Sequence, residues 1–217
     1  MTFTASLSMQ LFSGAFLTGM VLSLSLIMAI GPQNAHIMRM GLMRQHLWIT
    51  VAVCVGTDIL LIALGVSGLA ALGGLPKSVI TAMTAAGALV LCVYGWRAMQ
   101  RFLQADASAQ GEADGGGAPI TRRQAVGTAL ALSWLNPHAW LDTAVLIGTA
   151  SLAYARPANA VFGIGAATGS LVWFVVLGEA MALLGRRMRS PGLWRALDGL
   201  VAVTMWGCAG WLVSGLF

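Results

Sequence analysis

The sequence predicts an all-α membrane protein with six transmembrane helices. Apolar residues make up 58% of the 217 residues and charged residues only 9%, whereas soluble domains carry about 25% charged residues. The mean hydropathy is +0.82. Six apolar stretches follow one another, each of about 20 residues or more, which is the length that crosses a bilayer as a helix. They are Met9–Met38, His46–Leu72, Ser78–Met99, Gln124–Tyr154, Ala158–Leu184 and Leu193–Phe217.

The first stretch is expected to stay in the membrane and not to be cleaved as a signal peptide. No basic residue precedes it, and Leu11–Ile30 alone spans about 30 Å as a helix.

The first and fourth stretches are each interrupted by a proline beside polar residues. A proline removes a backbone hydrogen bond from a helix, and such a break is tolerated in hydrocarbon only where it lines a cavity inside the protein. Matching breaks in the two halves of a membrane protein predict a substrate site between internal repeats, as in secondary transporters. The two interruptions are Gly31-Pro32-Gln33-Asn34 and Asn136-Pro137-His138.

The six helices are predicted to form two repeats of three, residues 1–103 and 122–217, joined by a flexible cytoplasmic linker over 104–121 that is rich in Ala, Gly, Ser and acidic residues. Gly56–Gly65 resembles Gly169–Gly178, and Gly87–Gly95 pairs with Gly199–Gly207. Because three is an odd number of crossings, the two repeats are expected to be inverted relative to each other.

Charge predicts the orientation in the membrane. If the N-terminus is outside, ten of the 12 Lys and Arg residues fall in inner loops, and only Lys77 and Arg156 fall outside. Positive loops remain in the cytoplasm, so both termini are predicted outside. The net charge of +5 then reflects topology, and no nucleic-acid partner is expected.

Small residues inside the predicted spans point to helix packing. The three cysteines all lie within spans, which argues against a disulfide framework. Glycines in the second and fifth spans are suited to close helix contacts. These glycines are Gly65, Gly68, Gly165 and Gly169.

Two carboxylates lie deep within predicted spans. Asp58 is about 18 Å along a helix from His46, and Asp142 lies well between Arg123 and Arg156. A carboxylate at mid-membrane costs about 2.5 to 3.5 kcal/mol. Each is therefore expected to face the bundle interior and to meet a cation, a proton or hydrogen-bond donors. Bonding to a neighbouring helix alone is the other interpretation.

Polar residues beside the prolines also have two interpretations. The amides Gln33, Asn34 and Asn136 bind substrate or satisfy the backbone carbonyls that the prolines leave without a partner. His138 titrates near physiological pH and is either a proton carrier or a structural residue.

Three other ionisable residues are expected at the inner interface. His36 and His46 flank the first inner loop, and Glu179 lies two helical turns before Arg186 and Arg187, which makes it a candidate ion-pair partner for them.

Three motifs resemble the lysine exporter (LysE) family, most closely its arginine-exporting branch. They are Gly31-Pro32-Gln33-Asn34-Ala35, Gly56-Thr57-Asp58 and the run LSWLNPHAWLD at 132–142, and the resemblance covers nearly the whole length. Relatives that export neutral amino acids usually carry other residues around these prolines. Thr57 departs from the family, which usually has Ser there. The resemblance implies an inner-membrane exporter of L-lysine or L-arginine, driven by the membrane potential or a proton gradient.

Together these observations predict a substrate site with separated charges. Asp58 and Asp142 would bind the two cationic groups of a basic amino acid, and the helix breaks would hold its α-carboxylate. Asp58 is the first candidate for proton coupling, because burial favours a protonated carboxyl group. The predicted substrate-binding residues are Asp58, Asp142, Gln33, Asn34, Asn136 and His138.

Other functions stay open on sequence alone. One alternative is an exporter of neutral amino acids, and another is an exporter of divalent metal cations, since Asp58, Asp142 and His138 are suitable ligands. An intramembrane serine protease is a remote alternative, with Ser67 in the pattern Gly65-Val66-Ser67-Gly68 as nucleophile and His138 as base.

No cofactor and no resident metal are expected. Lys77 stands outside any phosphate-binding loop pattern, so the sequence predicts no ATP site. The expected partners are the substrate, a coupling proton or the membrane potential, and the lipid bilayer; a homo-oligomer is left open.

Overall fold

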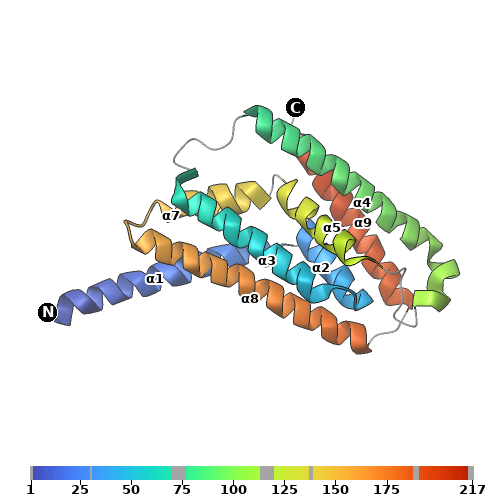
Figure 1. Cartoon of the computed structure of the whole chain (residues 1–217), viewed down its shortest axis with the longest axis horizontal. Coiled ribbons are helices and arrows are strands. Elements are labelled where there is room, and N and C mark those ends of the chain that lie inside the picture. The colour runs from blue at the N-terminus through green and yellow to red at the C-terminus, as the bar shows by residue number, and fades with distance from the viewer. Residues whose placement is uncertain are drawn as a thin grey trace. The chain divides into compact units, whose positions relative to one another are not determined.

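The computed structural model describes residues 2–29, 31–69, 77–112, 120–136, 139–187 and 191–214, and all regular structure in them is helical (Figure 1). Two segments, labelled η, are π-helical. The elements are α1 (Thr2–Ile27), α2 (Pro32–Met43), α3 (Leu47–Leu64), η1 (Gly65–Leu69), α4 (Lys77–Glu112), α5 (Arg122–Trp134), η2 (Trp140–Leu146), α7 (Ile147–Ser151), α8 (Ala158–Arg187) and α9 (Pro191–Ser214).

Three of the described helical stretches are long and apolar enough to cross a membrane: Leu47–Gly68, Ala158–Arg186 and Arg195–Ser214. The broken pair Phe12–Ile27 and Pro32–Met43 makes a fourth if it counts as one span. The predicted class, an all-α membrane protein, is confirmed. The arrangement of six spans in two inverted repeats stays a prediction.

The first predicted break lies between two helices. α1 ends at Ile27 and α2 begins at Pro32, with Gly31 extended at the N-cap position. Proline suits the first position of a helix, because its missing N–H would have no intrahelical partner there. It also biases the preceding residue towards extended backbone. Pro32 therefore starts a new helix and does not kink a continuous one.

The second break divides the fourth predicted span. α5 ends at Trp134, and the backbone N–H of Leu135 donates to the carbonyl of Ala131. Helical structure is present again from Trp140, where η2 begins. Pro137 and His138 lie outside the described residues.

The chain forms two compact units. Unit 1 comprises residues 1–29, 55–76 and 138–173, and unit 2 comprises 30–54, 77–137 and 174–217. Helices α3 and α8 each contribute residues to both units. The units group residues that contact one another, and they differ from the predicted repeats, which stay a prediction.

The segment expected to be a flexible linker is partly helical. α4 continues to Glu112, so the first part of the predicted linker 104–121 belongs to this helix.

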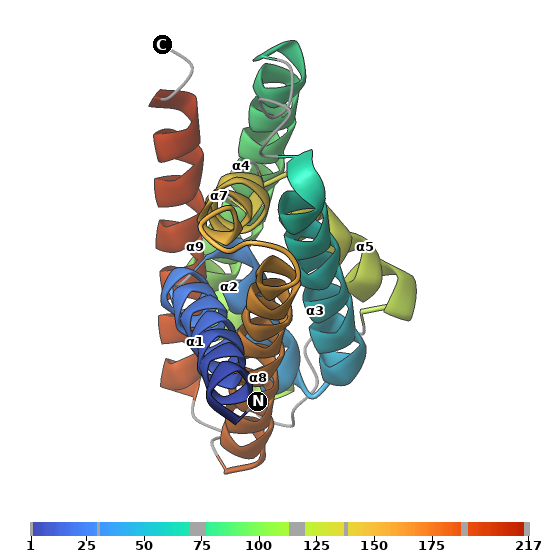
Figure 2. The ribbon, with the colours of Figure 1, turned by 90° about the vertical axis from the view of Figure 1, so that its left-hand side faces the viewer.

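Unit 1 is built on close helix contacts. The first half of α8 lies beside α1 (Figure 2), and Gly19 and Gly165 stand where the two backbones approach. A Cβ atom at Gly19 would overlap the Phe162 carbonyl oxygen, and one at Gly165 would overlap that of Phe16. The packing expected for Gly165 is therefore present, because only small residues permit this approach.

A second glycine contact joins η1 to the segment that follows Asp142. A Cβ atom at Gly65 would overlap the Ala144 carbonyl oxygen, and one at Gly148 would lie 2.8 Å from the backbone of Gly65. Gly68 was expected to pack in the same way. Instead it has a φ of 124°, and a Cβ atom there would meet none of the described residues within 4 Å, so its role is conformational.

Substituting Gly19 by alanine is expected to weaken unit 1. The added methyl group has no room against the Phe162 carbonyl, which forces α1 and α8 apart. Gly14→Ala in the same helix is the matched control, because a Cβ atom there would have nothing within 4 Å. Thermal unfolding in detergent should show a lower midpoint for Gly19→Ala and an equal or higher one for Gly14→Ala. Equal midpoints for the two variants would contradict the contact.

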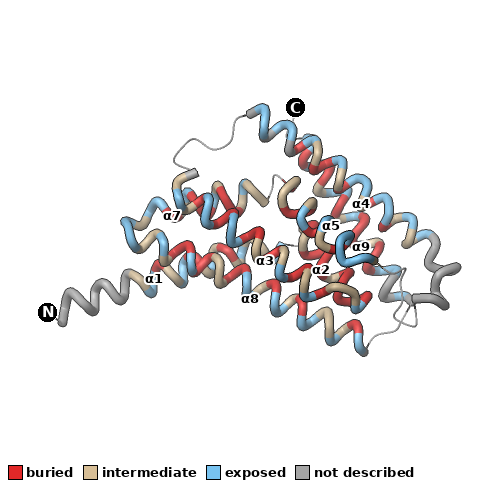
Figure 3. The backbone as a smooth tube through the Cα atoms, in the orientation of Figure 1, coloured by how far each residue is buried: buried red, intermediate tan, exposed pale blue. Residues whose placement is uncertain are grey.

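Unit 2 has the larger apolar core. α4 and α9 pack along each other (Figure 1), and Leu91, Val201 and Met205 are among their buried side chains. α2 is buried along most of its length (Figure 3). This short helix begins at the first break and contacts α5 and α9.

Candidate functional site

The start of α2 and the end of α5, which stand beside the two helix breaks, are bonded to each other within unit 2. The side-chain amide of Gln33, one residue after Pro32, donates a hydrogen bond of 2.7 Å to the hydroxyl of Ser133 in the last turn of α5. That hydroxyl in turn donates 2.8 Å to the Ala129 carbonyl. Ser133 is fully buried. A polar bond at this depth ties the start of α2 to the end of α5.

The amides predicted to bind substrate lie at this junction. Asn34 is in the first turn of α2 and is 5% exposed, and Asn136 follows α5 and is 8% exposed. Gln33 is half-buried. The N-cap residue Gly31 has no side chain that could cap the start of α2, and the N-terminus of a helix attracts negative charge. The junction is therefore polar and electrically positive, which suits a carboxylate ligand.

Asp58 is buried in unit 1. It lies near the middle of the apolar stretch Leu47–Gly68 and is 1% exposed. The Ser170 hydroxyl of α8 donates a hydrogen bond of 2.8 Å to its Oδ2. Gly169, next to Ser170, lies against the Met20 carbonyl, so the glycine contact with α1 helps to place the hydroxyl. A charged carboxylate at this depth requires polar or cationic partners.

Asp142 also belongs to unit 1, in the π-helical segment η2. It is half-buried, and its backbone carbonyl accepts from the N–H of Ile147, five residues on. π-Helical turns are frequent at functional sites because they reorient side chains within a helix. The sequence predicts a helix break near this point but not a π-helical segment.

Unit 2 also contains a buried ion cluster that the sequence did not predict. Asp198 of α9 accepts hydrogen bonds at Oδ1 from Arg39 of α2, at 2.5 Å, and from Arg101 of α4, at 2.9 Å. Asp198 is 3% exposed and Arg39 is 7% exposed. Arg39 and Arg101 had been assigned to inner loops by their charge alone.

His36 is also buried inside unit 2, and its place at the membrane interface stays a prediction. Its Nδ1 lies 2.7 Å from the hydroxyl of Tyr94, and its Nε2 lies 3.2 Å from the carbonyl of Ala125. A carbonyl only accepts, so Nε2 carries the proton and Nδ1 accepts from the tyrosine hydroxyl. Both ring nitrogens are thus satisfied in the neutral imidazole, and His36 is a structural residue.

Gln33, His36 and Arg39 form a polar stripe along α2. They are spaced by three residues, so they lie on neighbouring positions of one helix face. Their side chains reach three neighbouring helices. Gln33 bonds to α5, His36 bonds to α4 and to α5, and Arg39 bonds to α9. This stripe fixes the rotation of α2 about its own axis, and with it the direction of the first-turn amides.

The remaining candidates lie outside this network. Ser67 is exposed, and its hydroxyl donates 3.0 Å to the Leu64 carbonyl. Glu179 is exposed on α8. His46 bonds to the Ile120 carbonyl at 2.8 Å. Within the described residues, no three His, Cys, Asp or Glu side chains are grouped as a metal ion would need.

Comparison with known families decides the class of the protein. Residues 24–215 match the model of the LysE type translocators. The chain belongs to this family. The resemblance found in the three motifs is thus confirmed. The protein is a multi-pass membrane translocator and not an enzyme, so the protease interpretation of Ser67 does not apply.

Relatives of the translocator cover nearly all of its length. An arginine exporter protein ArgO of Yersinia enterocolitica is 35% identical over 88% of this chain and 92% of its own. A lysine exporter LysE of Corynebacterium efficiens is 31% identical over 89% and 96%. A putative amino-acid transporter of Mycobacterium tuberculosis is 38% identical over 86% and 90%. No solved structure gives a significant match.

Proposed function

We propose that the protein exports basic L-amino acids, lysine or arginine or both, across the bacterial inner membrane. One observation carries the proposal: a carboxylate, Asp58, is buried within an apolar helix of a translocator whose relatives include proteins named arginine and lysine exporters. A buried negative charge in such a helix is suited to a cationic ligand.

The substrate is held by its charges at opposite ends. Asp58 and Asp142 bind the α-ammonium and the side-chain cation, because charge-assisted hydrogen bonds are the stronger kind. Gln33, Asn34 and Asn136, with His138, receive the α-carboxylate near the positive start of α2. The hydrogen bond from Gln33 to Ser133 supports this part, since it joins the helix ends that stand beside the two breaks.

Transport follows alternating access. Residues 1–103 and 122–217 act as two inverted repeats of three helices, and both termini lie outside the cytoplasm. One repeat moves against the other to expose the site first to the inner and then to the outer face. The excess of cationic residues in the predicted inner loops supports this orientation.

Export is coupled to protons or to the membrane potential. Asp58 is the coupling candidate, because a carboxylate that alternates between substrate and proton links the two fluxes. The hydroxyl of Ser170 donates to it, and a hydroxyl donor is compatible with either the charged or the protonated form.

Proteoliposomes test the proposal. Vesicles that contain the purified protein are loaded with labelled arginine, lysine or threonine, and efflux is measured under a pH gradient and under an electrical potential separately. Arginine or lysine is expected to leave faster than threonine. Faster threonine efflux would assign the protein to the exporters of neutral amino acids and would contradict the proposed substrate.

A further inference from the structure

A cavity of about 660 Å³ in unit 2 carries a concentrated positive charge. Three arginines from three different elements line it, together with His46 and the indole of Trp48. Among the described residues that line the cavity none is acidic. The arginines are Arg44 after α2, Arg122 at the start of α5 and Arg186 near the end of α8.

Arg44 is held in a fixed position. It ends α2 in the left-handed conformation, with a φ of 53°, and its guanidinium donates through Nε, at 2.8 Å, and through Nη2 to the carbonyl of Gly185. Gly41 and Gly185 allow this contact, because a Cβ atom at Gly185 would lie 2.8 Å from the Gly41 carbonyl oxygen. One cation of the cavity is therefore fixed before any ligand binds.

Arg122 stands where its charge is unfavourable without an anion. It is the first residue of α5, whose first turn contains no acidic residue. A helix N-terminus is itself positive, so a cation there is destabilising unless negative charge lies close by. Thr121 and Gln124 cap the helix start, but these neutral groups leave the excess charge in place. The geometry thus favours an anion at this end of the cavity.

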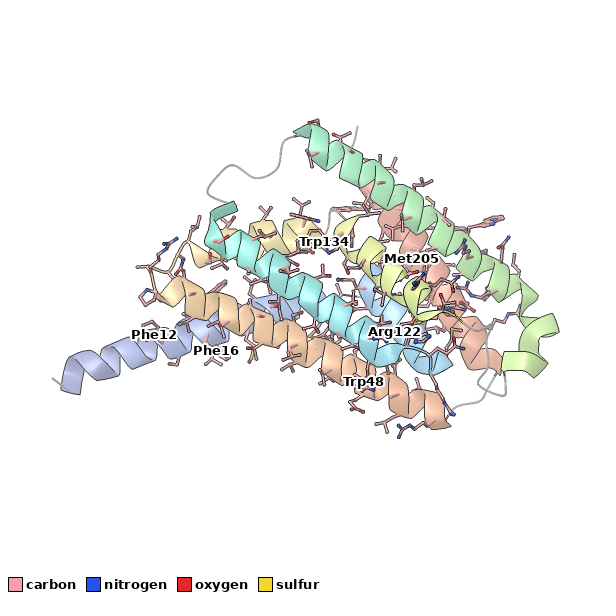
Figure 4. The ribbon with its side chains drawn as sticks, in the orientation of Figure 1. Phe12, Phe16, Trp48, Arg122, Trp134 and Met205 are labelled. Carbon is pink, nitrogen blue, oxygen red and sulfur yellow. The ribbon has the colours of Figure 1, made fainter. Side chains whose placement is uncertain are left out.

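The surroundings match the edge of a bilayer. Trp48 lies in the first turn of α3 (Figure 4) and is 48% exposed, and indoles gather at the headgroup level of membranes. From Arg186 towards the middle of α8, the helix exposes Leu183 and Val176, with the exposed Glu179 between them. A ligand with a phosphate group and acyl chains would contact the arginines at one end and the side chains of Leu183 and Val176 along its length.

We propose that this cavity binds the headgroup phosphate of an anionic phospholipid. Guanidinium groups pair with phosphate oxygens through two parallel N–H bonds, and basic pockets at the inner side of transmembrane helices select anionic lipids. A soluble phosphate would use the same arginines but would gain nothing from Trp48 and the exposed side chains of Leu183 and Val176. A basic amino acid is repelled by the three cations, so the cavity is separate from the proposed substrate site.

Native mass spectrometry of the detergent-purified protein tests the assignment. Phosphatidylglycerol, phosphatidylcholine and inorganic phosphate are added in separate titrations. The parental protein is expected to retain phosphatidylglycerol in preference to the other two. Arg122→Gln with Arg186→Gln should weaken that binding by about 30-fold. Arg97→Gln with Arg156→Gln removes the same charge from exposed positions elsewhere and should leave binding unchanged.

Two further variants keep the test decisive if the double variant does not fold. Arg122→Lys with Arg186→Lys keeps the charge and should retain most of the binding, and Arg186→Gln alone should lose part of it. Equal retention of phosphatidylglycerol and phosphatidylcholine would overturn the proposal, as would full displacement of the lipid by millimolar inorganic phosphate. Equal losses in the cavity and control variants would overturn it too, because they would report only net charge.

Discussion

Asp58→Asn is expected to insert normally and to lose export of basic amino acids. Asparagine has the same shape and still accepts from the Ser170 hydroxyl that contacts Asp58, but it cannot pair with a cation or carry a proton. A hydrogen bond to a charged group contributes about 1.5–3 kcal/mol, which corresponds to a rate loss of roughly 10- to 150-fold. Efflux of labelled arginine from proteoliposomes, normalised to inserted protein, measures the effect.

Stability separates this role from a structural one. Asp58 is 1% exposed, so removing its charge relieves a desolvation penalty. The Asp58→Asn protein is therefore expected to unfold at the same temperature as the parent or higher, with its residual efflux no longer accelerated by a pH gradient. Export at the parental rate, or a strong loss of thermal stability, would exclude Asp58 as the substrate and proton site.

Asp198→Asn is expected to give the largest loss of stability. It removes the negative charge from a cluster in which Arg39 and Arg101 both donate to one carboxylate oxygen. Arg39 is 7% exposed and cannot be hydrated in place. Breaking a buried ion pair on one side costs about 3–5 kcal/mol. The midpoint of thermal unfolding in detergent should fall clearly.

A paired variant shows whether the loss comes from uncompensated charge. Arg39→Leu combined with Asp198→Leu removes both buried charges, and replacing a buried ion pair by apolar residues is often neutral. Arg101 remains, but its side chain is 28% exposed and can reach water. The double variant should recover most of the stability. If it were less stable than Asp198→Asn, the cluster would act through its shape and not its charge.

The sequence predicted the features that depend on local rules. Proline cannot donate a hydrogen bond within a helix, so the break before Pro32 followed from one residue type. The position of Asp58 near the middle of an apolar helix followed from the rise of a helix and the length of the apolar stretch. The close contact at Gly165 followed from the absence of a side chain.

The long-range pairings could not be predicted in the same way. Arg39 was assigned to a loop because cations collect at the inner face, and only its contact with Asp198 shows that it is buried. The signal for Asp198 was present, since an acidic residue lies inside the sixth apolar stretch, as Asp58 does inside the second. In the same way, nothing near His36 in the sequence indicates Tyr94 as its partner.

The order of synthesis gives the ion cluster a further consequence. Arg39 and Asp198 are 159 positions apart, so the ribosome makes the cation long before its counter-charge. Arg101 is also made before α9. Until α9 is inserted, the guanidinium groups on α2 and α4 lack the carboxylate that α9 supplies. Burying them without it is unfavourable, so both groups are expected to remain hydrated until then. Unit 2 is therefore expected to pack fully only after α9 has been inserted. A chain truncated before residue 191 is expected to be degraded by membrane proteases.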